Sequence, residues 1–277
     1  RKTDCMPELP EVETTRRGLE PHCVGHRLLC LRVREPRLRW HVPVTDPPRV
    51  AGARIHSLDR RGKYLLFRLE AGTTILMHLG MSGHMRVVRP GQALKSHDHV
   101  DFELDSGELL RFNDPRRFGS LHITEDPPEQ HPLLSRLGPE PLGGEFRGEY
   151  LHRIAAGRRV AIKNLVMDSH VVVGVGNIYA TEALYRADIH PTRPAGRIAR
   201  QRYDHLVGCI RAVLEEAIEA GGTTLRDFSG ADGVPGYFQQ TLHAYGRGGQ
   251  PCGCCGRRLK EIRLAQRSTV YCPRCQR

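Results

Sequence analysis

The stretch MPELPEVE, residues 6–13, is the part of the chain from which the rest can be interpreted. It places two prolines and three glutamates directly before a helical pattern that runs from Glu11 to Val24 and ends at Gly25. A proline suits the first turn of a helix because its missing N–H would have no partner there. Acidic residues suit the positive end of the helix dipole. Local physics alone therefore favours a proline-started, acid-rich helix without a further role.

The same residues carry chemistry if Pro7 becomes the first residue of the chain. A free N-terminal proline is a secondary amine that can attack a sugar aldehyde carbon and form an iminium, with Glu8 beside it as proton donor. Arg1 to Cys5 precede Met6 in this sequence, and if they stay attached Pro7 is a tertiary amide without a usable lone pair. They hold too little apolar sequence for a signal peptide. We interpret them as a mis-set start or an added remnant, and catalysis by Pro7 depends on their removal.

The composition limits the class of protein. The 277 residues are enough for a substantial core and favour two domains, and 42 Lys and Arg against 31 Asp and Glu give a net charge of +11. This excess favours a polyanionic partner, nucleic acid first and an anionic membrane surface second. The sequence has no run of about 18 apolar residues, which argues against a membrane span.

The nine cysteines fall into two groups. Four are scattered singly and five lie between Cys252 and Cys275. An odd count, no secretion signal and a terminal cluster indicate a reducing cytoplasm and a metal site. The scattered cysteines are Cys5, Cys23, Cys30 and Cys209.

The terminal cluster has the spacing of a zinc site. Cys252-x-x-Cys255 and Cys272-x-x-Cys275 are separated by sixteen residues and supply four thiolates for one tetrahedral, structural Zn²⁺. Cys254 breaks the two-residue spacing, so we leave it outside the predicted site. The stretch 257–271 has the length of a β-hairpin, from which Arg263 and Arg267 would project toward a nucleic-acid backbone.

The first half of the chain predicts an antiparallel β-sandwich. Short apolar-polar alternations with turns between them occur from Leu28 to Ile123. Many short strands at regular intervals are typical of a sandwich. The proline-rich stretch from Asp126 to Pro141 predicts the linker between domains. The individual strands expected are Tyr64–Leu69, Thr74–Leu79, Val100–Leu104 and Leu109–Phe112, with a turn at 105–107.

The second half predicts helices. An apolar stripe at 3.6-residue spacing, stopped by Gly221 and Gly222, is a core face. The stretch 172–179 is a tight glycine turn that opens a helix, and it lacks the third glycine of a dinucleotide fingerprint. Backbone N–H groups at such a helix start suit phosphate, and Asn177 adds a side-chain donor. The stripe consists of Leu206, Val207, Ile210, Val213, Leu214, Ala217 and Ile218.

Four further segments can be interpreted without a functional role. The segment 60–64 is a solvated basic turn or a basic site next to a strand. In the loops 78–83 and 113–119, Met81 and Phe118 taken alone would more often be core residues, and Arg116 a surface charge. His97 and His99 could bind a metal, but no further ligands lie nearby in the sequence.

In combination these motifs resemble the formamidopyrimidine-DNA glycosylase family of bacterial base-excision enzymes. The resemblance runs from Met6 to the last cysteine pair. It rests on the proline–glutamate start, Lys63, the Asp-Pro-Arg-Arg-Phe-Gly loop at 114–119, the glycine–asparagine turn and the four cysteines in this order.

The resemblance implies an α+β fold in three domains. Residues 1–135 would form the catalytic N-terminal antiparallel β-sandwich with its N-terminal helix. Residues 136–245 would form a helix–two-turns–helix DNA-binding domain, and residues 246–277 a zinc-finger β-hairpin. It also implies damaged double-stranded DNA as partner, one structural zinc ion, no membrane association, a monomer, and a bacterial cytoplasmic location near the nucleoid.

The resemblance further assigns roles to residues. Pro7 would be the nucleophile, Glu8 the proton donor, and Lys63 and Arg267 the groups that assist β- and δ-elimination, while Glu11 and Glu13 would support the site. Met81 and Phe118 would fill the space left by the extruded base, and Arg116 would bond the estranged cytosine. The other predicted DNA contacts are His78, His97, Arg158, Lys163 and Asn177. Residues 222–237, with Thr223, Thr224 and Arg226, would form a lid over the base.

The predicted activity is therefore excision of oxidised purines, 8-oxoguanine and formamidopyrimidines, by a bifunctional glycosylase and AP lyase. One alternative is the related endonuclease VIII type, which prefers oxidised pyrimidines; the leucine–proline after Glu8 and the intact Arg116–Phe118 loop argue against it. The other alternative is a zinc-containing DNA-binding protein without catalysis, which applies if Pro7 stays blocked.

Overall fold

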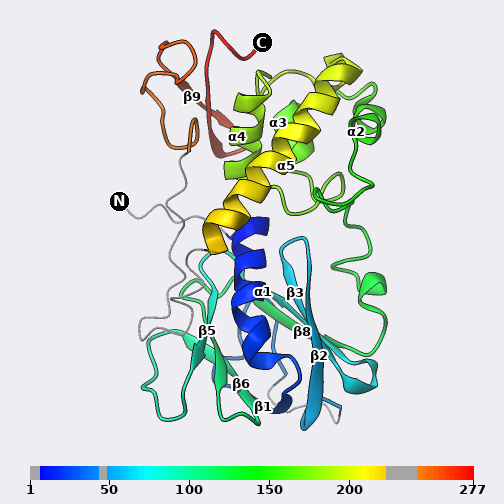
Figure 1. The fold of residues 1–277 in the computed structure, drawn as a ribbon, viewed down its shortest axis with the longest axis vertical. Helices are drawn as coiled ribbons and strands as arrows, with labels where there is room; N and C mark the ends of the chain where they lie inside the picture. Colours follow the sequence, from blue (N-terminus) through cyan, green and yellow to red (C-terminus); the bar gives the residue numbers. More distant parts are fainter. Residues whose placement is uncertain (1–6, 44–48, 223–241) are drawn as a thin grey trace. The chain divides into compact units, whose positions relative to one another are not determined.

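The structure, a computed structural model, describes residues 7–43, 49–222 and 242–277 (Figure 1). These residues form two compact units. One holds the residues up to Ser135 together with Ile218–Gly222, and the other holds residues 136–217 and 242–277. The predicted three-domain division is finer, since residues 246–277 belong to the second unit here. The predicted lid lies outside the described residues except for Gly222.

The first unit begins with helix α1, Leu9–Cys23, which starts two residues before the predicted Glu11 and places Pro10 in its first turn. Eight strands follow, and the four predicted strands are confirmed with ends that differ by at most two residues. Two short 3₁₀ turns, Glu70–Gly72 and Pro128–Gln130, complete the unit. The strands are β1 Arg27–Val33, β2 Ala53–Arg61, β3 Tyr64–Leu69, β4 Thr74–His78, β5 His84–Val88, β6 Asp98–Leu104, β7 Leu109–Asn113 and β8 Ser120–Thr124.

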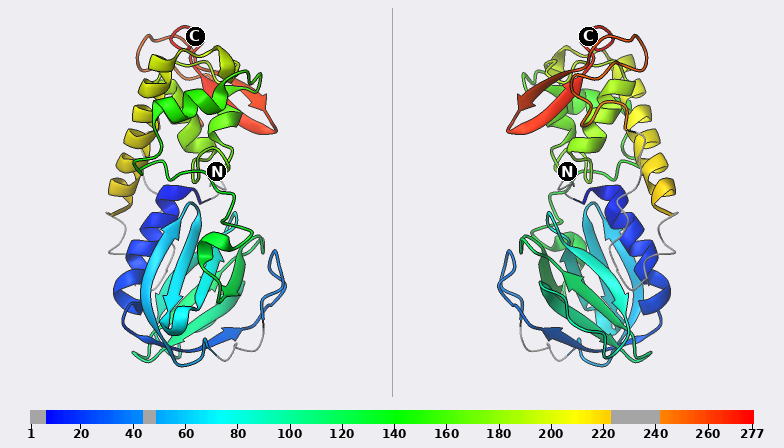
Figure 2. Two further views of the ribbon diagram at one scale, coloured as in Figure 1. Left: turned by 90° about the vertical axis from the view of Figure 1, so that its right-hand side faces the viewer. Right: turned by 90° about the vertical axis from the view of Figure 1, so that its left-hand side faces the viewer.

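The eight strands form one antiparallel sheet folded into two layers, which confirms the predicted sandwich (Figure 2). Their order is β5-β7-β6-β1-β2-β3-β4-β8, and only two residue pairs join β1 to β2 at the fold line. The rings of Phe67 in β3 and Phe102 in β6 meet across the layers with centroids 5.0 Å apart. Helix α1 packs against β2 and β3 of one layer and β5 of the other (Figure 1). The start of α1 is thereby fixed on the sandwich.

The second unit is helical and ends in a hairpin. All seven residues of the predicted apolar stripe are buried on α5, Arg200–Gly222. Gly221 and Gly222 are the last described residues of that helix, and they follow the end of the stripe. The other elements are α2 Gly148–Ala155, α3 Ile162–Val166, α4 Asn177–Arg186, a 3₁₀ turn η3 Ala195–Arg197, β9 Lys260–Leu264 and β10 Arg267–Tyr271.

Among the described segments, the protein contains no helix that is both long enough and apolar enough to cross a bilayer.

Candidate active site and nucleic-acid interface

Pro7 and Glu8 lie at the N-terminal end of α1, and both are buried. Glu8 is the N-cap, with an extended backbone and a side chain only 2% exposed. Its backbone N–H donates a 2.9 Å hydrogen bond to Oε2 of Glu11, and the Glu8 carboxylate in turn accepts from the backbone of Glu11. This capping box holds one carboxylate at the positive end of the helix, next to Pro7.

Glu13 joins α1 to the sheet. Its carboxylate accepts hydrogen bonds from Arg16 and Arg17 on the helix and, at 3.0 Å, from Nε of Arg60 on β2. Burial would raise the pKa of Glu13, but these hydrogen bonds and the arginine charges hold it below its ordinary value. Strands β2 and β3 pair up to Arg61 and Tyr64, so the half-buried Lys63 sits in the turn directly after the anchored strand.

His78 at the end of β4 pairs with Tyr64 in the register of β3 and β4. Its Nδ1 accepts a 2.9 Å hydrogen bond from the N–H of Gly80, which leaves the ring proton on Nε2. Burial, together with the positive charges of Lys63 and Arg39, lowers the pKa of His78 to about 4. The ring is therefore neutral at pH 7 and presents an N–H donor.

The two predicted loops pack directly on each other. A Cβ at Gly80, where φ is +70°, would lie 2.4 Å from the backbone N of Gly119 and 2.4 Å from the carbonyl carbon of Phe118. Asp114, which is fully buried, accepts from the hydroxyl of Ser82 at 2.6 Å and from the N–H of Gly119 at 2.7 Å. Only a residue without a side chain at position 80 allows this contact, so the loops hold a fixed arrangement.

A cavity of about 780 Å³ opens where these loops meet. Phe118 is 42% exposed beside it, and the Arg116 guanidinium lies 5.1 Å from the centre of the Phe118 ring. The structure thus brings together four of the predicted DNA-contacting residues, His78, Met81, Arg116 and Phe118. The cavity is lined by Arg37, Leu38, Arg39, His78, Gly80, Met81, Arg116, Arg117 and Phe118.

Three arginines of this cavity were missed by the sequence analysis. Arg37 is held by a bidentate contact with Glu35, whose pKa is lowered to about 2 by the side-chain and backbone hydrogen bonds from Arg37. Arg39 stacks over the exposed Trp40 at 4.7 Å. The alternation of basic residues next to the only tryptophan, at 37–40, is the signal that could have identified Arg37 and Arg39. Arg117, with φ of 56°, has no such signal.

His97 is exposed, and its carbonyl accepts a 3.1 Å hydrogen bond from the N–H of Asp114 at the base of the same loop. His99 is buried, and its Nε2 lies 2.8 Å from the carbonyl oxygen of Asp114. Within the part of the chain that the structure describes, these two histidines do not belong to any cluster of metal ligands. The metal alternative for His97 and His99 therefore has no geometric support.

In the second unit, Lys163, Asn177 and the hairpin converge on one carbonyl. Nζ of Lys163 and Nδ2 of Asn177 each lie 3.2 Å from the oxygen of Ser268, which directly follows Arg267. Lys163 also donates to the hydroxyl of Thr269 at 2.7 Å and is only 1% exposed. This differs from the predicted DNA contact, because a buried ammonium needs protein acceptors and here it has them. Gly176 caps α4 ahead of Asn177, as the glycine turn predicted.

Strands β9 and β10 confirm the predicted hairpin. Ala265 and Gln266 both have positive φ, as a two-residue type I′ turn requires. Arg267 pairs with Leu264 and Arg263 pairs with Ser268, so the two arginines, although both exposed, lie on opposite faces. One face of the hairpin can therefore present only one of them to a nucleic-acid backbone.

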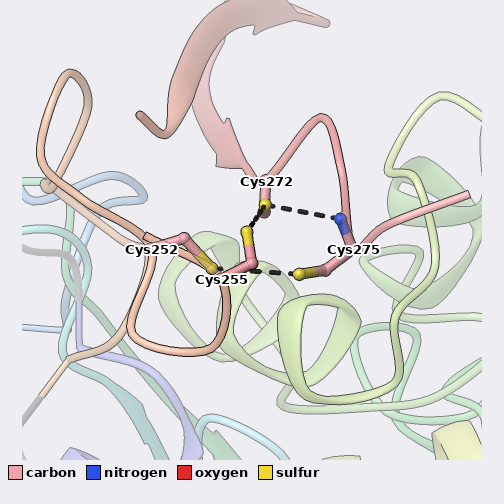
Figure 3. A group of neighbouring side chains, drawn as sticks. All are labelled: Cys252, Cys255, Cys272 and Cys275. Atoms are coloured by element: carbon pink, nitrogen blue, oxygen red, sulfur yellow. Dashed lines mark hydrogen bonds between the residues drawn. The ribbon is translucent and has the colours of Figure 1, made fainter. Parts of the chain in front are cut away.

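The four predicted zinc ligands lie together, with sulfur atoms that all fall within 4.8 Å of one another (Figure 3). Cys255 and Cys272 are 3.5 Å apart and Cys252 and Cys275 are 4.0 Å apart, sulfur to sulfur. Tetrahedral zinc with Zn–S bonds of about 2.3 Å requires sulfur separations of about 3.8 Å. The residues therefore fit one structural Zn²⁺, and Cys254 lies outside the group, as expected.

Tyr185 of α4 contacts this group. Its hydroxyl lies 3.1 Å from Sγ of Cys252 and 3.7 Å from Sγ of Cys254. Burial would raise the pKa of the Cys252 thiol, but the hydrogen bond from Tyr185 and neighbouring backbone N–H groups lower it to about 6. This favours the thiolate form that zinc binds.

Comparison with known proteins gives matches over nearly the whole chain. Residues 6–121 match the model of the formamidopyrimidine-DNA glycosylase N-terminal domain, residues 137–229 that of the H2TH domain of the same enzymes, and residues 249–277 that of a zinc finger found in FPG and IleRS. A formamidopyrimidine-DNA glycosylase of Alkalilimnicola ehrlichii is 59% identical over 98% of this chain and 100% of its own length.

Solved structures agree with this result. The crystal structure of the MutM (Fpg) protein of Thermus thermophilus is 41% identical, with a TM-score of 0.84 over 98% of both chains. A complex of Lactococcus lactis Fpg with DNA that contains N7-benzyl-Fapy-dG is 31% identical, with a TM-score of 0.86 over 98% of this chain and 99% of that one.

Proposed function

The chain belongs to the formamidopyrimidine-DNA glycosylase family, and from that premise we propose how its residues excise oxidised purines from duplex DNA. The activity is that of a bifunctional glycosylase and AP lyase acting on 8-oxoguanine and formamidopyrimidines. The observation that supports the mechanism best is the capped start of α1, where Glu8 lies buried beside Pro7 and Glu13 anchors the same helix to Arg60.

Base release begins at Pro7, once it is the first residue. Its nitrogen lone pair bonds to C1′ of the damaged nucleotide, and the base leaves with the electrons of the glycosidic bond. Glu8 takes the proton from the proline nitrogen and passes it to the sugar ring oxygen, so that the ring opens to an iminium. The helix dipole favours the carboxylate form of Glu8 at the N-cap, which suits it to accept this proton first.

Strand cleavage follows from the iminium. Loss of a C2′ proton breaks the bond to the 3′ phosphate, and loss of a C4′ proton then breaks the bond to the 5′ phosphate. Lys63, in the turn after the anchored strand, is proposed to move protons in these steps, and Arg267 to hold a leaving phosphate. Water then hydrolyses the iminium and frees Pro7.

The loops that line the cavity of the first unit suit the gap that an extruded base leaves in the duplex. Phe118 and Met81 fill the space vacated in the duplex, and Arg116, positioned over Phe118, bonds the estranged cytosine. The Nε2–H of the neutral His78 ring donates a hydrogen bond to a phosphate oxygen. Arg37 and Arg39 add phosphate contacts along the rim. His97, exposed beside the Asp114 loop, adds a further DNA contact.

In the second unit Lys163 is proposed to position rather than to contact DNA. Its bonds to Ser268 and Thr269 fix the hairpin that carries Arg267, and Asn177 adds a third bond to the same carbonyl. The helix start at Asn177 then offers backbone N–H groups to phosphate. Arg158 is exposed and remains a proposed DNA contact.

Zinc, held by Cys252, Cys255, Cys272 and Cys275, supplies only a cross-link that orders the finger. We further propose a monomeric protein that works in the bacterial cytoplasm near the nucleoid. The support for this is the bacterial source of the similar proteins and the net charge of +11, which suits a DNA partner.

The experiment that tests this function is borohydride trapping on a duplex with 8-oxoguanine opposite cytosine. Only an iminium can be reduced onto the DNA, so a covalent adduct distinguishes the enzyme from a DNA-binding protein without catalysis. If the protein binds this duplex but neither cuts it nor forms an adduct with it, the proposal is contradicted.

A further inference from the structure

A second arginine-lined cavity lies in the helical unit, apart from the residues discussed so far except Arg158. It has a volume of about 600 Å³ and lies between the chain leaving α2 and the 3₁₀ turn η3. The side chains of Arg158, Arg159 and Arg197 are all exposed there. The cavity is lined by Gly157, Arg158, Arg159, Pro194, Gly196 and Arg197.

The backbone that carries these arginines is held in place by hydrogen bonds. Gly196 donates to the carbonyl of Arg158 at 2.9 Å, Ala195 donates to Val160 at 2.9 Å, and Ile162 donates to Arg193 at 2.9 Å. A Cβ at Gly196 would lie only 3.0 Å from the oxygen of Arg158, so glycine allows the two segments to meet. Two segments far apart in the sequence thus bring the three arginines to the lining of one cavity.

The arginines of this cavity differ from two other arginine groups of the described residues, each of which shares a carboxylate. Arg16, Arg17 and Arg60 share Glu13, and Arg34 and Arg111 share Asp101. Among residues 7–43, 49–222 and 242–277, by contrast, no ion pair involves Arg158, Arg159 or Arg197. Three like charges held together without a counter-charge repel one another, and a bound anion removes that repulsion.

We propose that this cavity binds a phosphate group, and specifically a phosphodiester of the DNA backbone outside the lesion. Guanidinium groups bind phosphate bidentately, and the cavity is far larger than one phosphate needs, which suits a segment of backbone. Arg158 precedes Lys163 by five residues, a reach of at most about 17 Å. Duplex DNA presents roughly five phosphates per strand over that length.

This inference rests on the proposed function, because it takes the hairpin braced by Lys163 as part of the DNA-binding face. It extends that face by two residues, Arg159 and Arg197, which the family resemblance did not assign.

The test measures the salt dependence of binding to a duplex with a tetrahydrofuran abasic analogue, which cannot be excised. The double variant Arg159→Gln/Arg197→Gln is compared with Arg186→Gln/Arg200→Gln. The control pair loses the same charge from arginines that are already paired, with Glu216 at 2.6 Å and Glu149 at 3.7 Å. Each lost phosphate contact makes the negative slope of log K against log salt less steep by about 0.9. The slope of the cavity variant should therefore be less steep by about 1.8, and that of the control pair should change little.

Two further measurements identify the anion. If inorganic phosphate raises the melting temperature of the wild type but not of the cavity variant, while the DNA slope is unchanged, the cavity binds free phosphate instead of the DNA backbone. If neither the slope nor the phosphate response changes in the cavity variant, the inference is overturned. Arg159→Lys/Arg197→Lys keeps the charge and should keep the slope while it weakens binding, which excludes misfolding as the cause.

The failure of this inference and the failure of the proposed function can be distinguished. Binding to the abasic analogue needs no catalysis, so a lowered slope without a borohydride adduct would support the cavity and reject the chemistry. If the wild type forms an adduct, but the cavity variant keeps the salt slope of the wild type and phosphate has no effect on either, the chemistry is supported and the cavity is rejected.

Discussion

The backbone N–H of Glu8 donates a 2.9 Å hydrogen bond to Oε2 of Glu11, and this bond closes the first turn of α1 on the side of Pro7. The carboxylate of Glu11 is used to cap the helix, which suits the supporting role that the family resemblance implies for it. The position of the proposed nucleophile thus depends on the same interaction that starts the helix.

Glu11→Ala should remove this bond and lower the free energy of unfolding by about 1 kcal/mol, the usual value of a helix cap. It should also slow single-turnover excision, because Pro7 and Glu8 lose their fixed orientation. Glu11→Gln keeps an oxygen acceptor and should retain most of both. Equal losses for alanine and glutamine would show that the charge of Glu11, not its hydrogen bond, matters.

Glu13→Gln should destabilise the fold by about 3 kcal/mol, because it leaves three arginines around a neutral amide where they had a buried carboxylate. Urea unfolding measures the change. Glu20→Gln on the same helix is the matched control: Glu20 pairs with Arg16 at 2.9 Å, but its side chain is 46% exposed, and its loss should change stability by at most about 1 kcal/mol. If the two variants are equally stable, Glu13 does not anchor α1.

Tyr185→Phe should loosen the zinc site without changing its ligands. The hydroxyl is 3.1 Å from Sγ of Cys252, and loss of such an outer partner weakens metal affinity by about 10-fold or more. Competition with a chromogenic chelator measures the change. In protein whose zinc is replaced by cobalt, Tyr185→Phe should shift the thiolate-to-metal absorption bands relative to the wild type. Tyr203→Phe removes another buried hydroxyl, bonded to Ala195 at 2.8 Å, and should leave both readouts unchanged. Equal changes in metal affinity for Tyr185→Phe and Tyr203→Phe would show that the Tyr185 hydroxyl has no specific role at the zinc site.

His78 should titrate with a midpoint near pH 4 in the folded protein, because burial and the charges of Lys63 and Arg39 lower its pKa. The unfolded chain has an ordinary histidine pKa near ~6.5. Since the folded pKa is depressed, the unfolded state binds the proton first, and the stabilisation present above pH ~6.5 is lost as the pH falls toward 4. Nuclear magnetic resonance of the ring protons, assigned with His78→Gln, measures the midpoint. A value near ~6.5 would contradict the prediction, because it would show that burial and the two positive charges do not lower the pKa of His78.

Much of the fold could be predicted because its signals are local. Alternation over 100–104 and 109–112, the stripe on α5 and the spacing of the four cysteines each depend on neighbours within a few residues. The start of α1 was placed two residues late, since a proline inside the first turn looks like a boundary in the sequence.

The site was predicted less completely, because burial depends on partners far away in the chain. Lys163 looked like a surface cation, yet its acceptors Ser268 and Thr269 lie more than a hundred residues later. Arg159 and Arg197 come together only through a ladder between two loops. The opposite faces of Arg263 and Arg267 follow from the register of β9 and β10, which a one-residue shift would reverse.

The central claim is that a free amine at Pro7 attacks the sugar, and one measurement tests it directly. Protein that begins at Pro7, verified by intact mass, is incubated with an 8-oxoguanine:cytosine duplex and borohydride, beside protein that retains residues 1–6. The account predicts a covalent adduct at Pro7 for the first form and none for the second. Excision without an adduct at Pro7, or an equal adduct with both forms, would contradict it.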